Sequence, residues 1–215
     1  MSIPGLLDHV VIAGPDLDAL VAWFAERTGV RAAPGGAHPT GTANALVALT
    51  IDGERGPQYI ELIGPDPARA GEAPPATFGI DALDGPSVQA YSVHPDDIDA
   101  TVAGSRERGY DPGDVRDLSR RTPAGALLEW RLTGTGEDRL DVPFLIDWGA
   151  TAQPGLGDIP SLELVSFVRV EPDPEPLREV LAALGLGDGA AETVAGEQPG
   201  YRLELRRPDG AVVTL

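Results

Sequence analysis

Two side chains with acid–base or metal-binding chemistry stand in apolar surroundings early in this 215-residue sequence. His9 lies within the apolar run 6–13, and Glu61 lies between Ile60 and Leu62. A neutral imidazole and a carboxylate can transfer protons or bind a divalent cation. A histidine in an apolar strand is more often a hydrogen-bonded core residue than a site residue. Burial of the Glu61 carboxylate without a partner would be costly in free energy. We therefore expect Glu61 to have a partner, and His9 or a metal ion is the simplest one.

His38 and Asn44 are candidates for a supporting role. His38 follows Gly35-Gly36 in a segment rich in turn residues. It is either a solvated turn residue or an imidazole that folds over the site as a general acid or base. Asn44, at the start of the next expected strand, could orient a substrate carbonyl or cap the loop.

The aromatic residues and paired arginines also have two interpretations each. Tyr91, Trp130 and Trp148 lie on expected strands, where core packing is the commoner role, although they could line a cavity for an apolar or planar ligand. Arg120 and Arg121 are expected as solvated charges, with an anion clamp as the alternative.

Composition excludes several classes of function. There is no cysteine, so disulfides, thiolate nucleophiles and cysteine zinc sites are absent. The formal net charge of −18 argues against nucleic acid and anionic membranes as partners. No dinucleotide fingerprint, phosphate loop or Ser/His/Asp arrangement is evident, so no nucleotide cofactor is expected. No apolar run could span a bilayer and the N-terminus lacks signal-peptide features, which predicts the cytoplasm.

The elements that must position these residues begin with a strand feeding a helix. The run 6–13 ends at Gly14-Pro15, and helical spacing follows from Leu17 to a terminating Gly29, with Asp16 placed to cap the helix. A loop over 31–41 and strands over 42–49 and 58–63 follow, the strands joined by a hairpin at Asp52-Gly53.

The same order returns after about 80 residues, which indicates a repeated module. A strand over 87–93, a cap over 94–97, a helix over 98–108 and strands near 114–118, 126–132 and 142–148 are expected. A shorter copy follows: a strand over 162–170, a helix ending at Gly185, and a closing hairpin over 201–215. We expect an α+β chain with modules at 1–70 and 84–150 and a partial module at 160–215.

These modules resemble those of the vicinal oxygen chelate superfamily, and more narrowly its glyoxalase-like domain branch. The similar stretches are Leu7-Asp8-His9-Val10-Val11, Tyr59 to Gly64, Gly35 to Pro39, Gly41 to Leu46 and Pro143 to Gly149. The resemblance implies tandem βαβββ modules, paired about a pseudo-twofold axis, whose strands curl into a mixed-sheet cup. Members of this superfamily commonly pair, so it also implies that a homodimer is conceivable.

The resemblance further implies metal ligands on the first and last strands of each module. By position these are His9 and Glu61 in the first module and Gln89 and Asp147 in the second. Gln89 offers an amide oxygen without charge. Matching the strand ends places Ile146 opposite Glu61, so Asp147 reaches the cup only if a bulge turns it. The cation would be Zn, Ni, Mn or Fe.

Two functions from different classes follow from the resemblance. The first is a divalent-metal-dependent lyase, isomerase or dioxygenase acting on a small organic carbonyl or hydroxylated substrate, with Glu61 or His38 moving the proton. The alternative is a metal-free protein that binds a small molecule in the same cup, as antibiotic-sequestering, bleomycin-resistance members do. A regulatory or scaffold role for the third module is a further possibility.

Overall fold

A computed structural model describes residues 3–122, 125–134 and 139–215. The helices are α1 (Leu17–Thr28), α2 (Ile98–Glu107) and α3 (Glu175–Leu184), with short 3-10 turns at Pro67–Arg69, Thr77–Ala82, Pro154–Leu156 and Gly187–Gly189. The strands are β1 (Leu7–Ala13), β2 (Ala33–Ala37), β3 (Thr42–Ile51), β4 (Glu54–Pro65), β5 (Ser87–Val93), β6 (Arg116–Arg121), β7 (Leu127–Leu132), β8 (Phe144–Asp147), β9 (Ser161–Glu171), β10 (Glu192–Ala195), β11 (Gly200–Arg206) and β12 (Val212–Thr214). The expected α+β class with curled sheet is confirmed.

The first unit follows the expected order with one addition. The Asp16 carboxylate accepts from the Ala19 amide at 2.8 Å and caps α1, and Gly29 ends the helix with φ of 76°. Asp52 and Gly53, with φ of 53° and 80°, turn β3 into β4. The expected loop over 31–41 contains β2, which pairs antiparallel with β3. Its Pro and Gly content hides the strand from a propensity argument.

The second unit repeats the first with a changed register. The side chain that caps α2 belongs to Asp97, which accepts from the Ala100 amide at 2.9 Å. Asp97 follows Asp16 by 81 residues, one more than the interval of about 80 expected from the sequence. A shift of one residue in a strand moves every side chain to the opposite face, and this decides which residues of β5 enter the cup.

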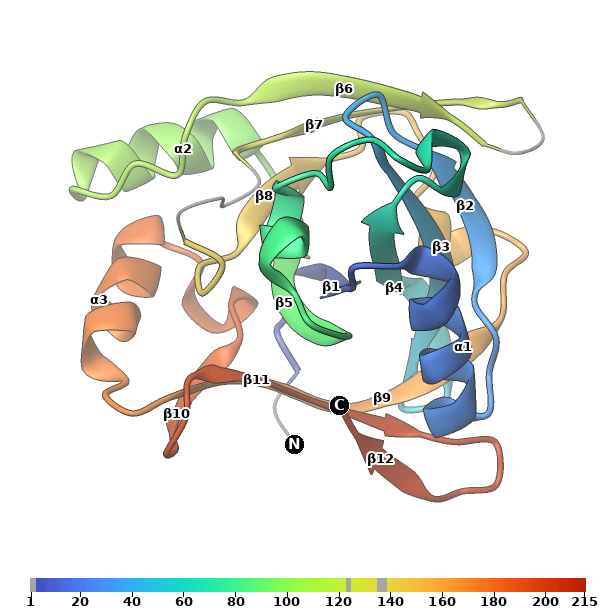
Figure 1. The fold of residues 1–215 in the computed structure, drawn as a ribbon. Coiled ribbons are helices and arrows are strands. Elements are labelled where there is room, and N and C mark those ends of the chain that lie inside the picture. The colour runs from blue at the N-terminus through green and yellow to red at the C-terminus, as the bar shows by residue number, and fades with distance from the viewer. Residues whose placement is uncertain (1–2, 123–124, 135–138) are drawn as a thin grey trace.

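The twelve strands of the described residues form one sheet, ordered β12-β11-β9-β3-β4-β1-β5-β8-β7-β6, with β10 added to β9 and β2 to β3. At its centre β1 pairs parallel with β4 and antiparallel with β5, which joins the first two units. The third unit extends the sheet because β9 pairs parallel with β3. Figure 1 shows β9 and β11 curving beneath the first two units, so the third unit belongs to the same continuous sheet.

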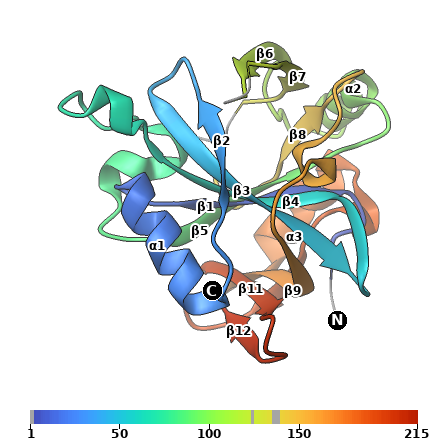
Figure 2. The ribbon, with the colours of Figure 1, turned by 90° about the vertical axis from the view of Figure 1, so that its right-hand side faces the viewer.

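Each face of the central strands has its own apolar cluster, because successive side chains alternate. One face, with Val10, Ile60 and Leu62, packs against α1 and against Phe167 and Leu203 of the third unit. The other face carries Val11, Tyr59 and Phe144. Figure 2 shows α1, β9, β11 and β12 on one side of the central strands and the β6–β7 hairpin on the other. The cup lies beneath this hairpin. No helix of the described residues is long and apolar enough to span a membrane.

Candidate active site

A β-bulge in β1 brings Asp8 to the same side as His9. The pairing with β5 runs from Leu7 opposite Val93 directly to His9 opposite Ser92, which leaves Asp8 as the extra residue. In a regular strand these consecutive side chains would point to opposite faces. Here the Asp8 carboxylate lies 2.7 Å from His9 Nδ1. The bulge therefore creates an Asp–His pair from neighbours in sequence.

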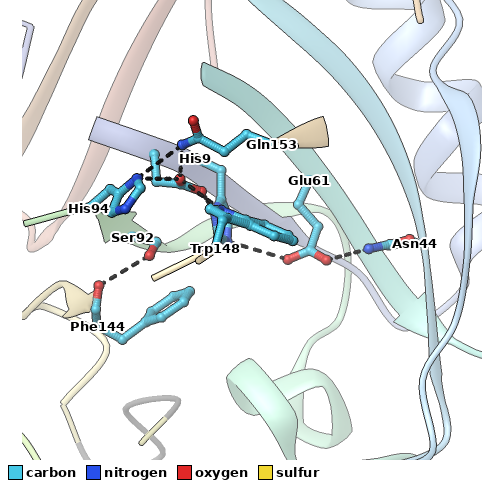
Figure 3. Close-up of polar contacts among 9 residues, drawn as sticks. His9, Asn44, Glu61, Ser92, His94, Phe144, Trp148 and Gln153 are labelled. Atoms are coloured by element: carbon cyan, nitrogen blue, oxygen red, sulfur yellow. Dashed lines mark hydrogen bonds and ion pairs between the residues drawn. The ribbon is translucent and has the colours of Figure 1, made fainter. Parts of the chain in front are cut away.

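Both oxygens of the buried Asp8 carboxylate accept hydrogen bonds. Trp148 donates its indole N–H to Asp8 Oδ2 at 3.0 Å, and the Gln153 amide donates to the same oxygen at 2.7 Å. Gln153 also lies 3.2 Å from His94 Nδ1. Figure 3 shows these side chains gathered around His9. Because a carboxylate accepts and does not donate, His9 Nδ1 carries the proton of this hydrogen bond, and Nε2 is the ring nitrogen that faces the cavity.

His9 Nε2 faces Glu61 across 3.8 Å. This distance is too long for a direct hydrogen bond, so both groups remain able to contact a third atom. Glu61 Oε1 accepts from the Asn44 amide at 2.5 Å, as Figure 3 shows. Side-chain alternation along β4 places Glu61 on the cup face together with Tyr59, whose ring stacks on His9 with 4.6 Å between centroids.

His38 extends this polar wall from the segment between β2 and β3. Its Nε2 lies 3.4 Å from Asn44 Nδ2 and its Nδ1 lies 2.8 Å from Thr42 Oγ1. Burial lowers the pKa of His38 below 6.5, with the Glu61 charge opposing that effect in part. A neutral imidazole that accepts from Asn44 and bonds to Thr42 fits both contacts.

The polar wall borders a cavity of about 480 Å³. The opposite wall comes from the second unit and the connector before it, and β6 contributes the side chains of Arg116, Asp117 and Arg120. The apolar residues of this wall are Phe78, Trp130, Leu132, Phe144, Ile146 and Trp148. The two tryptophan rings are 5.6 Å apart, and Phe144 meets the edge of His9 at 5.4 Å. The cavity is therefore polar on one side and largely aromatic on the other.

Six of the sequence-derived candidates line this cavity: His9, His38, Asn44, Glu61, Trp130 and Trp148. Tyr91 does not. It lies on the opposite face of the sheet, where it packs against Phe167 at 5.3 Å and its hydroxyl accepts from the Ala191 amide. Burial raises the pKa of Tyr91 far above that of a free phenol. Tyr91 joins the second and third units and does not contact a ligand in the cup.

Gln89 and Asp147 are also away from the cavity. Gln89 falls at the register shift between Val11 opposite Ala90 and Ile12 opposite Val88. Asp147 accepts from the Gly149 amide at 2.8 Å and faces Arg131 at 3.7 Å. The sequence placed Asp147 in the cup only if a bulge turned its side chain inward. The pairing of β7 with β8 shows no such bulge at Asp147, and Asp147 is not among the residues that line the cavity.

The cup therefore has donors for a metal on one side only. His9 and Glu61 face each other, whereas the second unit presents the hydrocarbon side chains of Phe144 and Ile146. Within the described residues no three His, Asp or Glu side chains gather in a way that could hold an ion. Catalytic zinc sites ordinarily use three protein ligands. This donor set does not fit the four-ligand centre expected from Gln89 and Asp147.

Two important residues were missed or misjudged from sequence. Asp8 is charged within an otherwise apolar run, which is a usable signal, but its contact with His9 depends on the bulge. Arg120 was expected to be solvated, and it is buried at 7% exposure in the cavity wall. Because Arg120 and Arg121 alternate faces on β6, one enters the cup while the other stays in solvent.

Comparison with known proteins agrees with this architecture. A sequence profile for the glyoxalase-like domain matches residues 7–185, most of the chain. The chain belongs to the glyoxalase-like domain family. It is thereby a member of the vicinal oxygen chelate superfamily, as the motifs predicted. The search of curated proteins found no match.

Solved structures with related folds are distant in sequence. A hypothetical protein from Staphylococcus aureus is 17% identical with a TM-score of 0.56, over 97% of this chain and 84% of that one. Methylmalonyl-CoA epimerase from Streptomyces coelicolor is 23% identical with a TM-score of 0.44, over 71% of this chain and 100% of that one. The Mycobacterium tuberculosis epimerase is 22% identical with a TM-score of 0.39, over 68% and 88%. The similarity to the Staphylococcus aureus protein extends over the third unit as well, and it concerns the fold alone.

Proposed function

We propose that this glyoxalase-like protein binds a small organic carbonyl compound in its cup and moves a proton with His9 Nε2, without a resident metal. The observation that carries the proposal is the Asp8–His9 pair, which holds the imidazole so that Nε2 lies toward Glu61 at the cavity. An imidazole held by a carboxylate on its other nitrogen is a suitable general base near neutral pH.

In the proposed step the base takes a proton from the carbon next to the carbonyl. The C–H bond breaks, its electron pair stays on the substrate as an enolate, and the proton moves to Nε2. The resulting imidazolium lies between two carboxylates, Asp8 at 2.7 Å from Nδ1 and Glu61 at 3.8 Å from Nε2. Return of a proton to carbon completes an isomerisation or an exchange, so no oxidant or reductant is consumed.

The cavity supports a substrate of limited size with an apolar part. Its volume of about 480 Å³ falls within the range usual for small-molecule sites. The aromatic wall formed by Phe144, Trp130 and Trp148 favours a planar or hydrocarbon group opposite the polar wall.

Hydrogen exchange measures the proposed step directly. Protein treated with a chelator is incubated in D₂O with phenylpyruvate, pyruvate or phenylacetone, and NMR follows loss of the proton next to the carbonyl. We expect catalysed exchange with at least one compound and a drop of about 100-fold or more in His9→Gln. His94→Gln is the matched control, because His94 is on the far side of Asp8 and outside the cavity wall.

Equal exchange by His9→Gln and the unchanged protein would refute the assignment of His9. Titration calorimetry with Zn, Ni, Mn and Fe(II) tests the metal. Near-stoichiometric binding that requires both His9 and Glu61, together with exchange that depends on it, would replace this proposal by the metal-dependent function expected from sequence.

A second candidate is ligand binding without chemistry. The aromatic wall formed by Phe144, Trp130 and Trp148 favours it, because these side chains can hold a ligand and supply no acid or base. A ligand that raises the melting temperature of metal-free protein while no compound exchanges its proton would support this candidate. A cytoplasmic location and a homodimer stay predictions from the sequence and the resemblance.

A further inference from the structure

Arg120 is a buried cation in the wall of the cup. It lies on β6 at 7% exposure and donates from Nη1 to the Gly35 carbonyl oxygen at 2.6 Å. Gly35 and Gly36 let β2 approach this closely: a Cβ on Gly36 would lie 2.8 Å from the Arg121 carbonyl oxygen and 3.1 Å from Arg120 Nη1. The glycine pair noted in the sequence thus makes room for the guanidinium.

The charge of Arg120 has no close counter-ion in the described part of the chain. No carboxylate oxygen there lies within 4.0 Å of it, and its recorded hydrogen bond goes to a neutral carbonyl. Burial lowers the pKa of Arg120, with Glu61 and Tyr59 opposing that effect, yet a guanidinium stays protonated at neutral pH. A buried charge without a partner is costly, so the position calls for an anion.

Arg120 is one of the residues that line the cavity. Within the described residues no nitrogen of Arg120 is among the fully buried side-chain atoms without a hydrogen-bond partner, so the nitrogens that make no recorded bond keep some accessible surface. Neighbouring arginines differ from it. Arg131, which is partly exposed, is paired with Asp99 at 2.8 Å, and the exposed Arg121 donates to the Gly125 carbonyl oxygen. In a chain of net charge −18, a buried cation that lines a cavity and has no carboxylate oxygen within 4.0 Å in the described residues calls for an explanation.

We propose that Arg120 binds the carboxylate of the small molecule that occupies the cup, so that the ligands are aromatic or apolar monocarboxylates. The Arg120 proposal rests on the proposed function in one respect only, which is that both use the same cavity as the binding site. The planar guanidinium matches a carboxylate through paired N–H donors. The ring or hydrocarbon part of the ligand then contacts Trp130, Trp148 and Phe144 across the cavity.

Paired ligands that differ only in charge test the assignment. Phenylacetate and 1-naphthylacetate are compared with phenylacetamide and 1-naphthylacetamide by titration calorimetry and ligand-observed NMR, with phenyl phosphate as a second anion. We expect each acid to bind about tenfold or more tightly than its amide, and Arg120→Gln to remove that preference. Arg120→Lys should keep part of it, because the charge stays and the paired geometry is lost.

Arg121→Gln is the matched control, one residue away and exposed, and should bind the acids as the unchanged protein does. Equal affinity for acid and amide, absence of binding by every acid in the set, or equal losses in both arginine variants would overturn the proposal. Preference for phenyl phosphate over the acids would overturn the carboxylate class. If Arg120→Gln fails to fold, the acid–amide comparison and the Lys variant still decide the question.

His9→Gln separates this inference from the proposed reaction. It should keep the preference for acid over amide even though it no longer exchanges protons. If proton exchange is lost and acid binding is retained, the Arg120 assignment stands. If the acid–amide difference is absent while proton exchange is retained, the Arg120 assignment is refuted and the proposed reaction is not.

Discussion

Asp8 and His9 are consecutive residues of β1, yet their side chains meet on one face of the sheet with 2.7 Å between Oδ1 and Nδ1. The bulge that permits this contact also brings Asp8 within reach of Trp148 and Gln153, from a part of the chain about 140 residues later. Asp8 therefore orients the imidazole and also ties the second unit to the first.

Asp8→Asn tests this double role. The amide nitrogen would face N–H groups that now donate to a carboxylate, so we expect the free energy of unfolding to fall by about 1–3 kcal/mol. Urea unfolding measures the change. Asp147→Asn is the control, since Asp147 is partly exposed and its ion pair with Arg131 is worth about 0–1 kcal/mol. Equal effects of the two substitutions would contradict the role given to Asp8.

Gly35→Ala tests how tightly β2 covers the polar wall. An added Cβ would lie 2.2 Å from Asn44 Oδ1 and 3.1 Å from Leu46 Cγ, which forces the Asn44 amide away from Glu61. We expect a loss of about 1–3 kcal/mol in thermal or urea unfolding. Gly85→Ala provides the comparison, because its Cβ would meet no atom within 4 Å. A stability of Gly35→Ala like that of Gly85→Ala would show that β2 can move aside at little cost.

His38 should make stability dependent on pH. Since burial lowers its pKa below 6.5, the unfolded chain takes up a proton first as the pH falls. The His38 contribution is therefore complete above about pH 6.5 and decreases below it. Melting temperatures at about pH 7.5 and about pH 5 should differ less in His38→Gln than in the unchanged protein. An identical pH dependence in both would mean that His38 is protonated equally in the folded and unfolded states.

Phe167→Ala tests whether the third unit shares the core of the first two. Phe167 is fully buried, packs on Tyr91 and belongs to the same apolar cluster as Phe24 and Ile60. We expect a loss of about 3–5 kcal/mol and a single unfolding transition. Leu156→Ala, at a side chain 58% exposed, should change little. A separate early transition for the third unit in calorimetry would show that it unfolds independently.

The repeated strand–helix pattern was enough to predict most of the fold. Helical spacing placed α1, α2 and α3, aspartates cap α1 and α2, and the strand 87–93 coincides with β5. These features depend on local interactions that the sequence displays. β2 was missed as a strand because its Ala-Pro-Gly-Gly-Ala sequence has low strand propensity, and its pairing with β3 determines its structure.

The candidate site was predictable where regular alternation holds. His9 and Glu61 face the same cavity because β1 and β4 pair in register, with His9 opposite Tyr59 and Val11 opposite Glu61. The directions of Gln89 and Asp8 could not be predicted, because register shifts between β1 and β5 decide them. A repeat interval in error by one residue reverses a side chain, and nothing in the single sequence reports such an error.

The continuous sheet has consequences for self-association through strands. Its two ends are β12, only three residues long, and β6, where Arg116, Asp117 and Arg121 are exposed. A further strand adding to β6 would have to cover these charges, and β12 offers very little backbone to pair with. Copies of this chain should therefore resist joining edge to edge, even though two-fifths of their residues are apolar and the described residues form a sheet of twelve strands.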